Sequence, residues 1–259
     1  MVVAAPTPRA GALPQGRKVP CEKCPLRSRE FLRDFNAKEL EFVANFKSGE
    51  LNIEAGTSVL LQGTNSAHLY TILSGWAFRY KTLPDGRRQI LNYALPSDFL
   101  GLQGSVTDEM QHSVEALTDV LLCVFPREKL WELYSNYPTL AFDVTWLAAR
   151  EEQLLDEHLL SVGRRTSLER TAYLLMHLFS RAEEAGLTKR DAIQFPFTQQ
   201  HVADTLGMSL VHTNKTLRRL SATKAARWKD KTFQILDRDL LKKIAGFEPP
   251  TQRARRPFI

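Results

Sequence analysis

The chain has 259 residues, 43% of them hydrophobic, and a formal net charge of +6, so it is long enough to bury one large core or two ordinary ones. No apolar run approaches the roughly 20 residues that a membrane-spanning helix needs. Residues 1–20 are rich in Ala, Pro and Gly and lack the continuous apolar stretch of an export signal, so we expect a disordered N-terminal extension and a cytoplasmic protein without a membrane partner.

Charge is divided unevenly along the chain. Residues 164–259 hold 19 Lys and Arg against 9 Asp and Glu, whereas residues 1–163 hold 16 against 20. The resulting balances are +10 and −4. This segregation favours two domains, of which the second is suited to a nucleic-acid partner.

Short strand-like runs alternate with turn signals between about Gly49 and Phe125. The two-residue period of a strand is clearest over residues 76–81, where every second side chain is aromatic. Many short strands at this spacing predict an antiparallel jelly roll, whose interior holds either a ligand or only side chains. The turn signals are Glu54-Ala55-Gly56, Gly63-Thr64-Asn65, Ser74-Gly75, Pro84-Asp85-Gly86 and Pro96-Ser97-Asp98.

After Pro138 the apolar spacing becomes helical and continues to Gly163. A helix of this length is too long to be covered by a small barrel alone. We expect an exposed apolar stripe that pairs with the same helix of a second subunit, and packing against its own chain is the alternative. The stripe comprises Leu140, Val144, Leu147, Leu154 or Leu155, and Leu159.

A second helix is predicted from the capping box Thr166–Glu169 to just before Gly186. The Gly163-Arg164-Arg165 break in front of it is the expected hinge between the two domains. One face of the helix is apolar and carries Leu168, Ala172, Leu175, Phe179 and Ala182.

The stretch FTQQHVADTLGMSLVHTNKTLRRL, residues 197–220, predicts two short helices joined by a sharp turn. Thr198 can cap the first helix, Gly207 supplies the left-handed turn, and Ser209 can cap the second helix. A short basic helix of this kind fits the major groove of DNA. The inward positions are Val202, Ala203 and Leu206 in the first helix and Thr213, Thr216, Leu217 and Leu220 in the second.

A hairpin follows at residues 226–237, where two strand-like runs flank Lys229-Asp230-Lys231. Its charged tip is suited to phosphates beside the second helix, although the hairpin alone is also explained as an ordinary surface feature. The candidate DNA contacts are Thr198, Gln199, Gln200, Ser209, Leu210, Val211, His212, Asn214, Lys215, Arg218 and Arg219.

These segments predict an α+β fold with an N-terminal antiparallel jelly roll, a long dimerisation helix and a C-terminal winged helix-turn-helix. The expected parts are a sensor domain over residues 21–137, the dimerisation helix over 138–163, the DNA-binding domain over 164–247 and a loose basic tail over 248–259.

This order of domains resembles the CRP/FNR family of bacterial transcription regulators from about Cys21 to Phe247. The most specific matches are residues 197–220 and DFLGLQGSVTDEMQHSVEALTDVLLCVFPREKL, residues 98–130. The resemblance implies a homodimer on a two-fold symmetric site in double-stranded DNA, whose affinity or contact with RNA polymerase changes when a signal reaches the jelly roll. Two recognition helices related by a dimer axis read half-sites about one helical turn apart.

One branch of that family binds cyclic nucleotides with a Gly-Glu pair on the ribose and, ten residues after the Glu, an Arg on the phosphate. Here the matching positions read Gly101-Leu102 and His112-Ser113. Leu102 cannot accept the ribose hydroxyl bonds, and a mostly neutral His112 is a poor replacement for a bidentate guanidinium. We therefore expect no cyclic-nucleotide site. His112 is either hydrogen-bonded at a strand start or serves another anion or a haem.

Cys21 and Cys24 form a CxxC pair, and Cys123 lies at a position similar to the late cluster-binding cysteine of the oxygen-sensing FNR branch. As metal ligands these thiols would hold an iron–sulfur cluster together with a fourth ligand, but Glu30 stands where that branch has a further cysteine. A thiol switch, a zinc site and no ligand role are the alternatives. The cofactor therefore stays unknown, and the expected signal is a redox or other non-cyclic-nucleotide signal.

The residues that read bases also depart from the family pattern. Many relatives have Glu at the position of Val211 and Arg at that of Lys215, which read cytosine and guanine. Val211 can contact a thymine methyl, Asn214 suits adenine, and Lys215 suits guanine or a phosphate. Thr213 replaces a packed apolar residue, so its hydroxyl should bond a nearby carbonyl.

The competing interpretation is a metal-dependent jelly-roll enzyme with an appended nucleic-acid-binding module. Metal sites in such barrels cluster two or three His with a carboxylate, and only His68 and His112 fall in this barrel. No Gly-rich phosphate loop or nucleophile motif occurs either. A transcription regulator without catalytic activity is therefore favoured, and its operator, target genes and direction of regulation stay undetermined.

Overall fold

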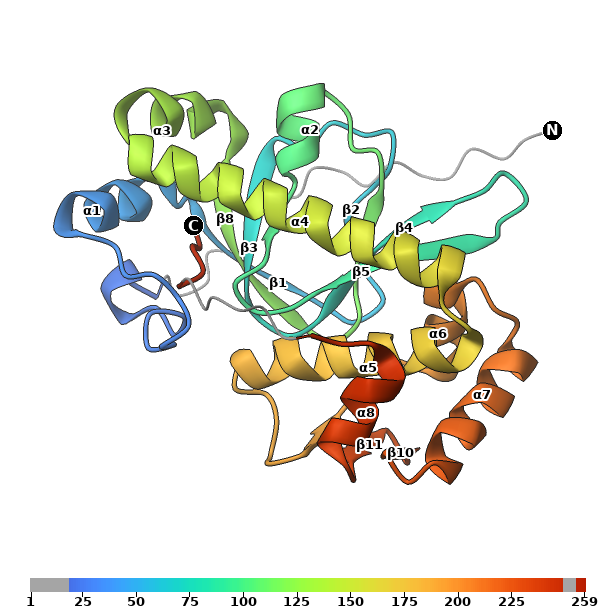
Figure 1. The fold of residues 1–259 in the computed structure, drawn as a ribbon. Helices are drawn as coiled ribbons and strands as arrows, with labels where there is room; N and C mark the ends of the chain where they lie inside the picture. Colours follow the sequence, from blue (N-terminus) through green and yellow to red (C-terminus); the bar gives the residue numbers. More distant parts are fainter. Residues whose placement is uncertain (1–18, 249–254) are drawn as a thin grey trace.

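The structure, a computed structural model, describes residues 19–248 and 255–259. Its N-terminal half is an antiparallel β roll of two four-stranded sheets (Figure 1), which confirms the predicted jelly roll. One sheet has the strand order β1 (Gly49–Ile53), β8 (Val120–Pro126), β3 (His68–Ser74) and β6 (Phe99–Leu100). The other has the strand order β2 (Ser58–Leu60), β7 (Ser113–Ala116), β4 (Ala77–Thr82) and β5 (Arg88–Ala94).

Strand β4 is buried on both faces where it begins. Ala77 belongs to the apolar cluster inside the roll, whereas Trp76 and Phe78 belong to a second cluster on the outside. The aromatic period over residues 76–81 therefore marks the outer face of the sheet, because small side chains fill the interior at this point. An apolar outer face requires a cover.

Short helical segments precede the roll, interrupt it and follow it. Helix α1 begins at a capping box in which Asn36 and Glu39 accept hydrogen bonds from each other's backbone N–H groups. The segments are η1 (Cys21–Lys23), α1 (Ala37–Phe46), α2 (Leu102–Thr107), η2 (Arg127–Lys129) and α3 (Leu130–Asn136).

Helix α4, Pro138–Arg164, crosses the roll and leads to the C-terminal domain (Figure 1). Its first half packs on its own chain, because Leu140, Val144 and Leu147 are buried. Its second half exposes apolar side chains, including Leu155 and Leu159. Packing against its own chain therefore explains the first half of the stripe, whereas the second half leaves an apolar surface exposed.

The expected break at Gly163-Arg164-Arg165 is wrong by about two residues. Helix α4 continues through Gly163 to Arg164, and Arg165 and Thr166 form the non-helical connection. Helix α5, Ser167–Glu184, then begins at the predicted Thr166–Glu169 capping box. Glycine inside a helix carries only a modest energetic cost, so this glycine does not end α4.

The C-terminal domain contains three further helices and a small sheet of order β10-β11-β9. This order of helices followed by a β hairpin is the predicted winged helix-turn-helix. Its elements are β9 (Ala192–Gln194), α6 (Gln199–Leu206), α7 (Leu210–Ala222), β10 (Ala226–Lys229), β11 (Thr232–Ile235) and α8 (Arg238–Ala245).

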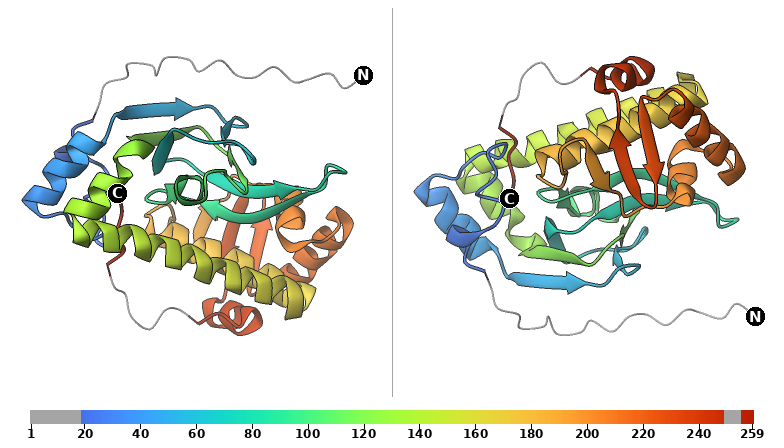
Figure 2. Two further views of the ribbon diagram at one scale, coloured as in Figure 1. Left: turned by 90° about the horizontal axis from the view of Figure 1, so that it is seen from above. Right: turned by 90° about the horizontal axis from the view of Figure 1, so that it is seen from below.

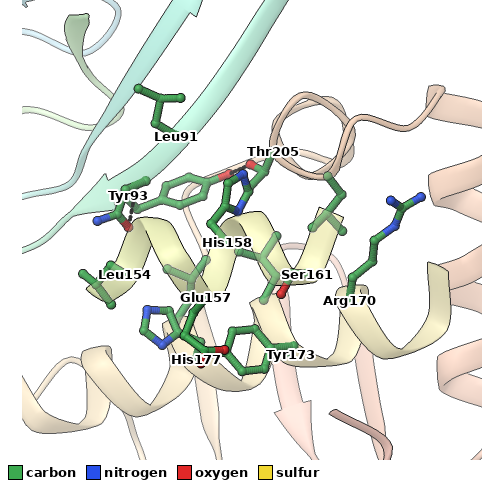
Figure 3. Close-up of a pocket in the computed structure, with 14 residues that line it drawn as sticks. Leu91, Tyr93, Leu154, Glu157, His158, Ser161, Arg170, Tyr173, His177 and Thr205 are labelled. Atoms are coloured by element: carbon green, nitrogen blue, oxygen red, sulfur yellow. Dashed lines mark hydrogen bonds between the residues drawn. The ribbon is translucent and has the colours of Figure 1, made fainter. Parts of the chain in front are cut away.

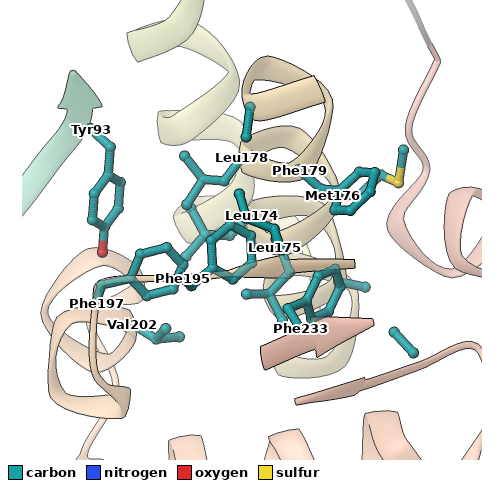
Figure 4. Close-up of a cluster of buried hydrophobic side chains, with 14 of the residues drawn as sticks. Tyr93, Leu174, Leu175, Met176, Leu178, Phe179, Phe195, Phe197, Val202 and Phe233 are labelled. Carbon is teal, nitrogen blue, oxygen red and sulfur yellow. The ribbon is translucent and has the colours of Figure 1, made fainter. Parts of the chain in front are cut away.

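The two domains share one hydrophobic cluster (Figure 4). Phe195 and Phe197 of the C-terminal domain stack with ring centroids 4.5 Å apart, and Trp76 meets Phe195 edge-on at 6.1 Å. Tyr93 of β5 lies 5.1 Å from Phe197. The C-terminal domain thus covers the apolar outer face of β4 and β5.

The expectation of a loose basic tail is wrong for residues 255–259, here called the tail segment. Pro257, Phe258 and Ile259 are buried against the sensor domain. Two apolar side chains after the arginines explain this packing. Residues 249–254, and residues 1–18 of the expected N-terminal extension, lie outside the described residues. Within the described part of the chain, no helix is long and apolar enough to cross a membrane.

Candidate nucleic-acid interface

Helix α6 begins and ends as its sequence predicts. Thr198 precedes it and accepts a hydrogen bond from the His201 backbone N–H at 3.4 Å, while His201 Nδ1 accepts one from the Thr198 N–H at 3.1 Å. Gly207 ends the helix in the left-handed region, with φ of 62°. This turn aims the following helix away from α6.

Helix α7 is capped by Ser209, whose hydroxyl accepts a hydrogen bond from the His212 N–H at 3.2 Å. Thr213, Thr216 and Leu220 are buried beneath it, as the sequence indicates. The expected partner of the Thr213 hydroxyl is missing, however: this buried oxygen has no hydrogen-bond partner among the described residues. By contrast, Thr216 Oγ1 donates to the His212 carbonyl at 2.9 Å.

The opposite face of α7 is open. Val211 is 79% exposed and Leu210 is 42% exposed. Asn214 is half-buried. The other predicted contacts are exposed and come from the caps and outer faces of α6 and α7: Thr198, Gln199, Gln200, Ser209, His212, Lys215, Arg218 and Arg219.

The predicted wing is present beside α7. Strands β10 and β11 pair antiparallel, with Lys229 opposite Thr232, so Asp230 and Lys231 form a two-residue turn. Both turn residues have positive φ, at 50° and 63°. These values match the two-residue turns that suit the twist of paired strands. The backbone of the wing tip, which carries the charged side chains, therefore has a defined conformation.

Sequence reasoning missed the contacts that hold α6 against strand β5. Arg88 Nη2 donates to Asp204 Oδ2 at 2.9 Å, and Gln89 Nε2 donates to the Thr205 carbonyl at 2.7 Å. Tyr93 and Thr205 share a hydroxyl hydrogen bond of 3.1 Å. Polar residues on a predicted strand gave no signal of this role, because their partners are more than 100 positions away in sequence.

Figure 3 shows this junction, where the Tyr93 ring reaches Thr205 and His158 of α4 lies beside them. Burial lowers the pKa of His158, and burial together with Arg181 and Arg150 lowers the pKa of His177 to about 3. Both imidazoles are therefore neutral near pH 7. The cavity that both histidines line has a volume of only about 30 Å³, too small for an effector molecule.

A larger cavity of about 640 Å³ lies between the roll and α4. Gly101, Leu102 and His112, the positions compared with the cyclic-nucleotide branch, all line it. Burial, Arg79 and Lys81 lower the pKa of His112 to about 4, so this side chain is neutral near pH 7. The cavity therefore offers an apolar Leu102 and an uncharged imidazole at the positions where a cyclic nucleotide needs a carboxylate and a guanidinium.

The three cysteines lie around the Lys47–Glu50 ion pair, whose atoms are 2.5 Å apart. Burial raises the pKa of Cys21 and raises that of Cys123 to about 12, in both cases against the opposing charge of Lys47. These thiols are therefore protonated near neutral pH. Glu30, at the position of the family's further cysteine, is exposed.

Within residues 19–248 and 255–259, no group of three or more His, Cys, Asp or Glu side chains is arranged to hold a metal ion. The same finding applies to His68 and His112, so the metal-dependent enzyme gains no support from this part of the chain.

Two domain families match the two halves of the chain. The cyclic nucleotide-binding domain matches residues 50–137, and the Crp-like helix-turn-helix domain matches residues 169–244. The fold and the open face of α7 thus define a two-domain protein in which a sensor-type β roll is joined to a DNA-binding helix-turn-helix.

Two relatives are similar to this chain in sequence, and one solved structure is similar to it in fold. A probable transcriptional activator of Rhizobium leguminosarum bv. viciae is 32% identical over 213 residues, which cover 79% of this chain and 84% of that protein. The transcriptional activator protein FnrL of Cereibacter sphaeroides is 30% identical over 195 residues, 73% of this chain and 77% of FnrL. FixK2 of Bradyrhizobium japonicum has a similar fold, with a TM-score of 0.69 at 22% identity over 77% of this chain and 98% of FixK2. The chain belongs to the CRP/FNR family of transcription regulators.

The unpaired hydroxyl of Thr213 generates a stability prediction. Thr213→Val replaces a buried, unsatisfied hydroxyl by a methyl group of similar size, so we expect the free energy of unfolding to rise by about 1–2 kcal/mol. Urea denaturation measures this change. Thr216→Val is the matched control and should not stabilise, because the Thr216 hydroxyl has a partner. Equal effects of the two substitutions would contradict the conclusion that the Thr213 hydroxyl is unsatisfied and the Thr216 hydroxyl is not.

Proposed function

We propose that the protein is a homodimeric activator of transcription that binds a two-fold symmetric site in double-stranded DNA. The open, basic face of α7 beside a rigid wing is the observation that carries this proposal. A helix with this exposure can enter the major groove, while the wing and the exposed start of α6 meet phosphates. Relatives named as transcriptional activators favour activation through RNA polymerase.

The exposed second half of α4 supports the dimer. Ala148, Leu155 and Leu159 lie on one face at seven- and four-residue steps, and all three are exposed. This spacing suits packing of two helices along an apolar seam. A two-fold axis along that seam would present two copies of α7 to one duplex.

The exposed residues of α7 predict a DNA half-site whose base sequence differs from the usual half-site of the family. Val211 projects into solvent where many relatives have a glutamate, so it can meet a thymine methyl but cannot accept a hydrogen bond from cytosine. Asn214 suits adenine, and Lys215 suits guanine or a phosphate.

Removing Asn214 and Lys215 tests the DNA contact. The double variant Asn214→Ala with Lys215→Ala should bind a DNA site selected from random sequence at least about 30-fold more weakly, because each good base contact contributes about 1–3 kcal/mol. Fluorescence anisotropy at one stated salt concentration measures this. Lys129→Ala removes an exposed charge from the sensor domain and should leave the affinity unchanged. Unchanged affinity of the double variant would refute the role of α7.

Charge placed in the seam tests the dimer. In Leu159→Glu, two carboxylates would meet across the proposed axis, so light scattering with size-exclusion chromatography should show one chain where the unmodified protein shows two. Leu83→Glu is the control, since Leu83 is a 53% exposed leucine on the β4–β5 turn. A Leu159→Glu variant that stayed dimeric would place the interface elsewhere.

We propose further that the signal is not a cyclic nucleotide, given Leu102 and neutral His112 in the cavity. Cyclic AMP or cyclic GMP at about 1 mM should leave the melting temperature unchanged, whereas a ligand present at 100 times its Kd would stabilise by about 2.7 kcal/mol. A clear rise in melting temperature would contradict this proposal.

Cys21, Cys24 and Cys123 are the candidates for a redox signal, and iron and acid-labile sulfide assays on protein purified without air decide whether they bind a cluster.

A further inference from the structure

The tail segment lies on the sensor domain although it follows the DNA-binding domain in sequence. Helix α8 ends at Ala245, whereas the end of the chain lies near α1, away from α8 (Figure 1, Figure 2). The DNA-binding domain is thus connected to the sensor domain at two places, through the break after α4 and through the tail segment.

Backbone hydrogen bonds hold one side of the tail segment. The Arg256 N–H donates to the Phe31 carbonyl, and the Arg33 N–H donates to the Arg256 carbonyl, both at 2.8 Å. This exchange is a short parallel bridge opposite Leu32. The segment therefore docks in a fixed register.

Apolar contacts hold the residues that follow. Phe258 is 4% exposed, and its ring centroid lies 4.8 Å from that of Phe35. Ile259 is 3% exposed, and its carbonyl oxygen accepts a hydrogen bond from the hydroxyl of Thr71, a buried residue of β3. The groove between residues 31–35 and β3 thus accepts both the backbone and the side chains of the tail segment.

Arg256 connects this groove to the DNA-binding domain. Its guanidinium pairs with Asp98, which is 1% exposed and also accepts a hydrogen bond of 2.5 Å from Arg181 of α5. Burial would raise the pKa of Asp98, but the two guanidinium groups hold it well below its usual range. One ionised carboxylate therefore joins the sensor domain, α5 and the tail segment. Arg256 also lines the larger cavity, so a ligand there could contact the tail segment.

We propose that the tail segment is an intramolecular latch: it occupies the groove between residues 31–35 and β3 and so limits how far the DNA-binding domain can turn about the break after α4. The chain from Glu248 to Arg255 spans at most about 25 Å when extended. A docked tail segment therefore restricts the distance between α8 and the groove. Release of the tail segment removes that restriction.

Amide hydrogen exchange of the full chain tests the latch. Phe258→Ala should raise exchange about tenfold in residues 31–35 and also in residues 163–170 around the break after α4, since both open when the tail segment leaves. Arg255→Ala changes an exposed side chain and should change neither region. Faster exchange confined to residues 31–35 would show a local packing role and overturn the proposal.

Binding of the segment from solution provides the second measurement. A fluorescent Arg-Arg-Pro-Phe-Ile peptide should bind the chain truncated after Ala254 at least tenfold more tightly than the full chain, whose groove is occupied. The bound peptide should leave exchange around residues 163–170 fast, because it does not connect the groove to α8. The same peptide with alanine at the Phe258 position is the control and should bind weakly. A folded truncated chain that did not bind the peptide would overturn the proposal. Neither measurement involves DNA, so the result is independent of the proposed regulatory function.

Discussion

The arrangement of the two domains depends on the apolar outer face of β4 and β5. Trp76 and Phe78 point away from the interior of the roll, so water would meet two large aromatic side chains if nothing covered them. Phe195 and Phe197 of the DNA-binding domain supply that cover. Burial of each such side chain contributes about 1.5–3 kcal/mol, so the sheet itself is a main determinant of where the DNA-binding domain sits.

The same strand also borders the larger cavity. Arg79 of β4 lines the cavity, donates a hydrogen bond of 2.5 Å to Glu151 of α4, and donates another of 3.0 Å to the Phe99 carbonyl. Its sequence neighbour Phe78 packs with the DNA-binding domain. A displacement of β4 would therefore affect the cavity, α4 and the helix-turn-helix together. Close-packed interiors transmit such displacements because they contain few voids.

Most of the fold and of the open DNA-binding face could be predicted from sequence, because local signals specify them. Thr198, Gly207 and Ser209 set the ends of two helices through hydrogen bonds within a few residues, and a charged two-residue turn defines the wing. The CRP/FNR resemblance follows from the order of these local elements. Local rules fail less often where the partner of a group is near in sequence.

The features that sequence missed depend on distant partners. The tail segment looks like a basic tail, because nothing near Arg256 indicates that Asp98 lies buried 158 positions away. The link between Gln89 and Thr205 spans 116 positions for the same reason. The predicted hydrogen bond of Thr213 was wrong for a different reason. A nearby carbonyl was the expected acceptor, but the packing beneath α7 leaves the Thr213 hydroxyl without a partner among the described residues.

At the wing tip, charged side chains occupy backbone positions where glycine would be less strained. Asp230 and Lys231 both occupy left-handed backbone positions that glycine adopts without strain, and each side chain there carries a cost of about 1–2 kcal/mol. A glycine turn would be easier to form but more flexible and uncharged. The hairpin therefore acts as a stiff support for the charged side chains beside α7, so in the proposed DNA complex little backbone ordering entropy would remain to be lost at the wing.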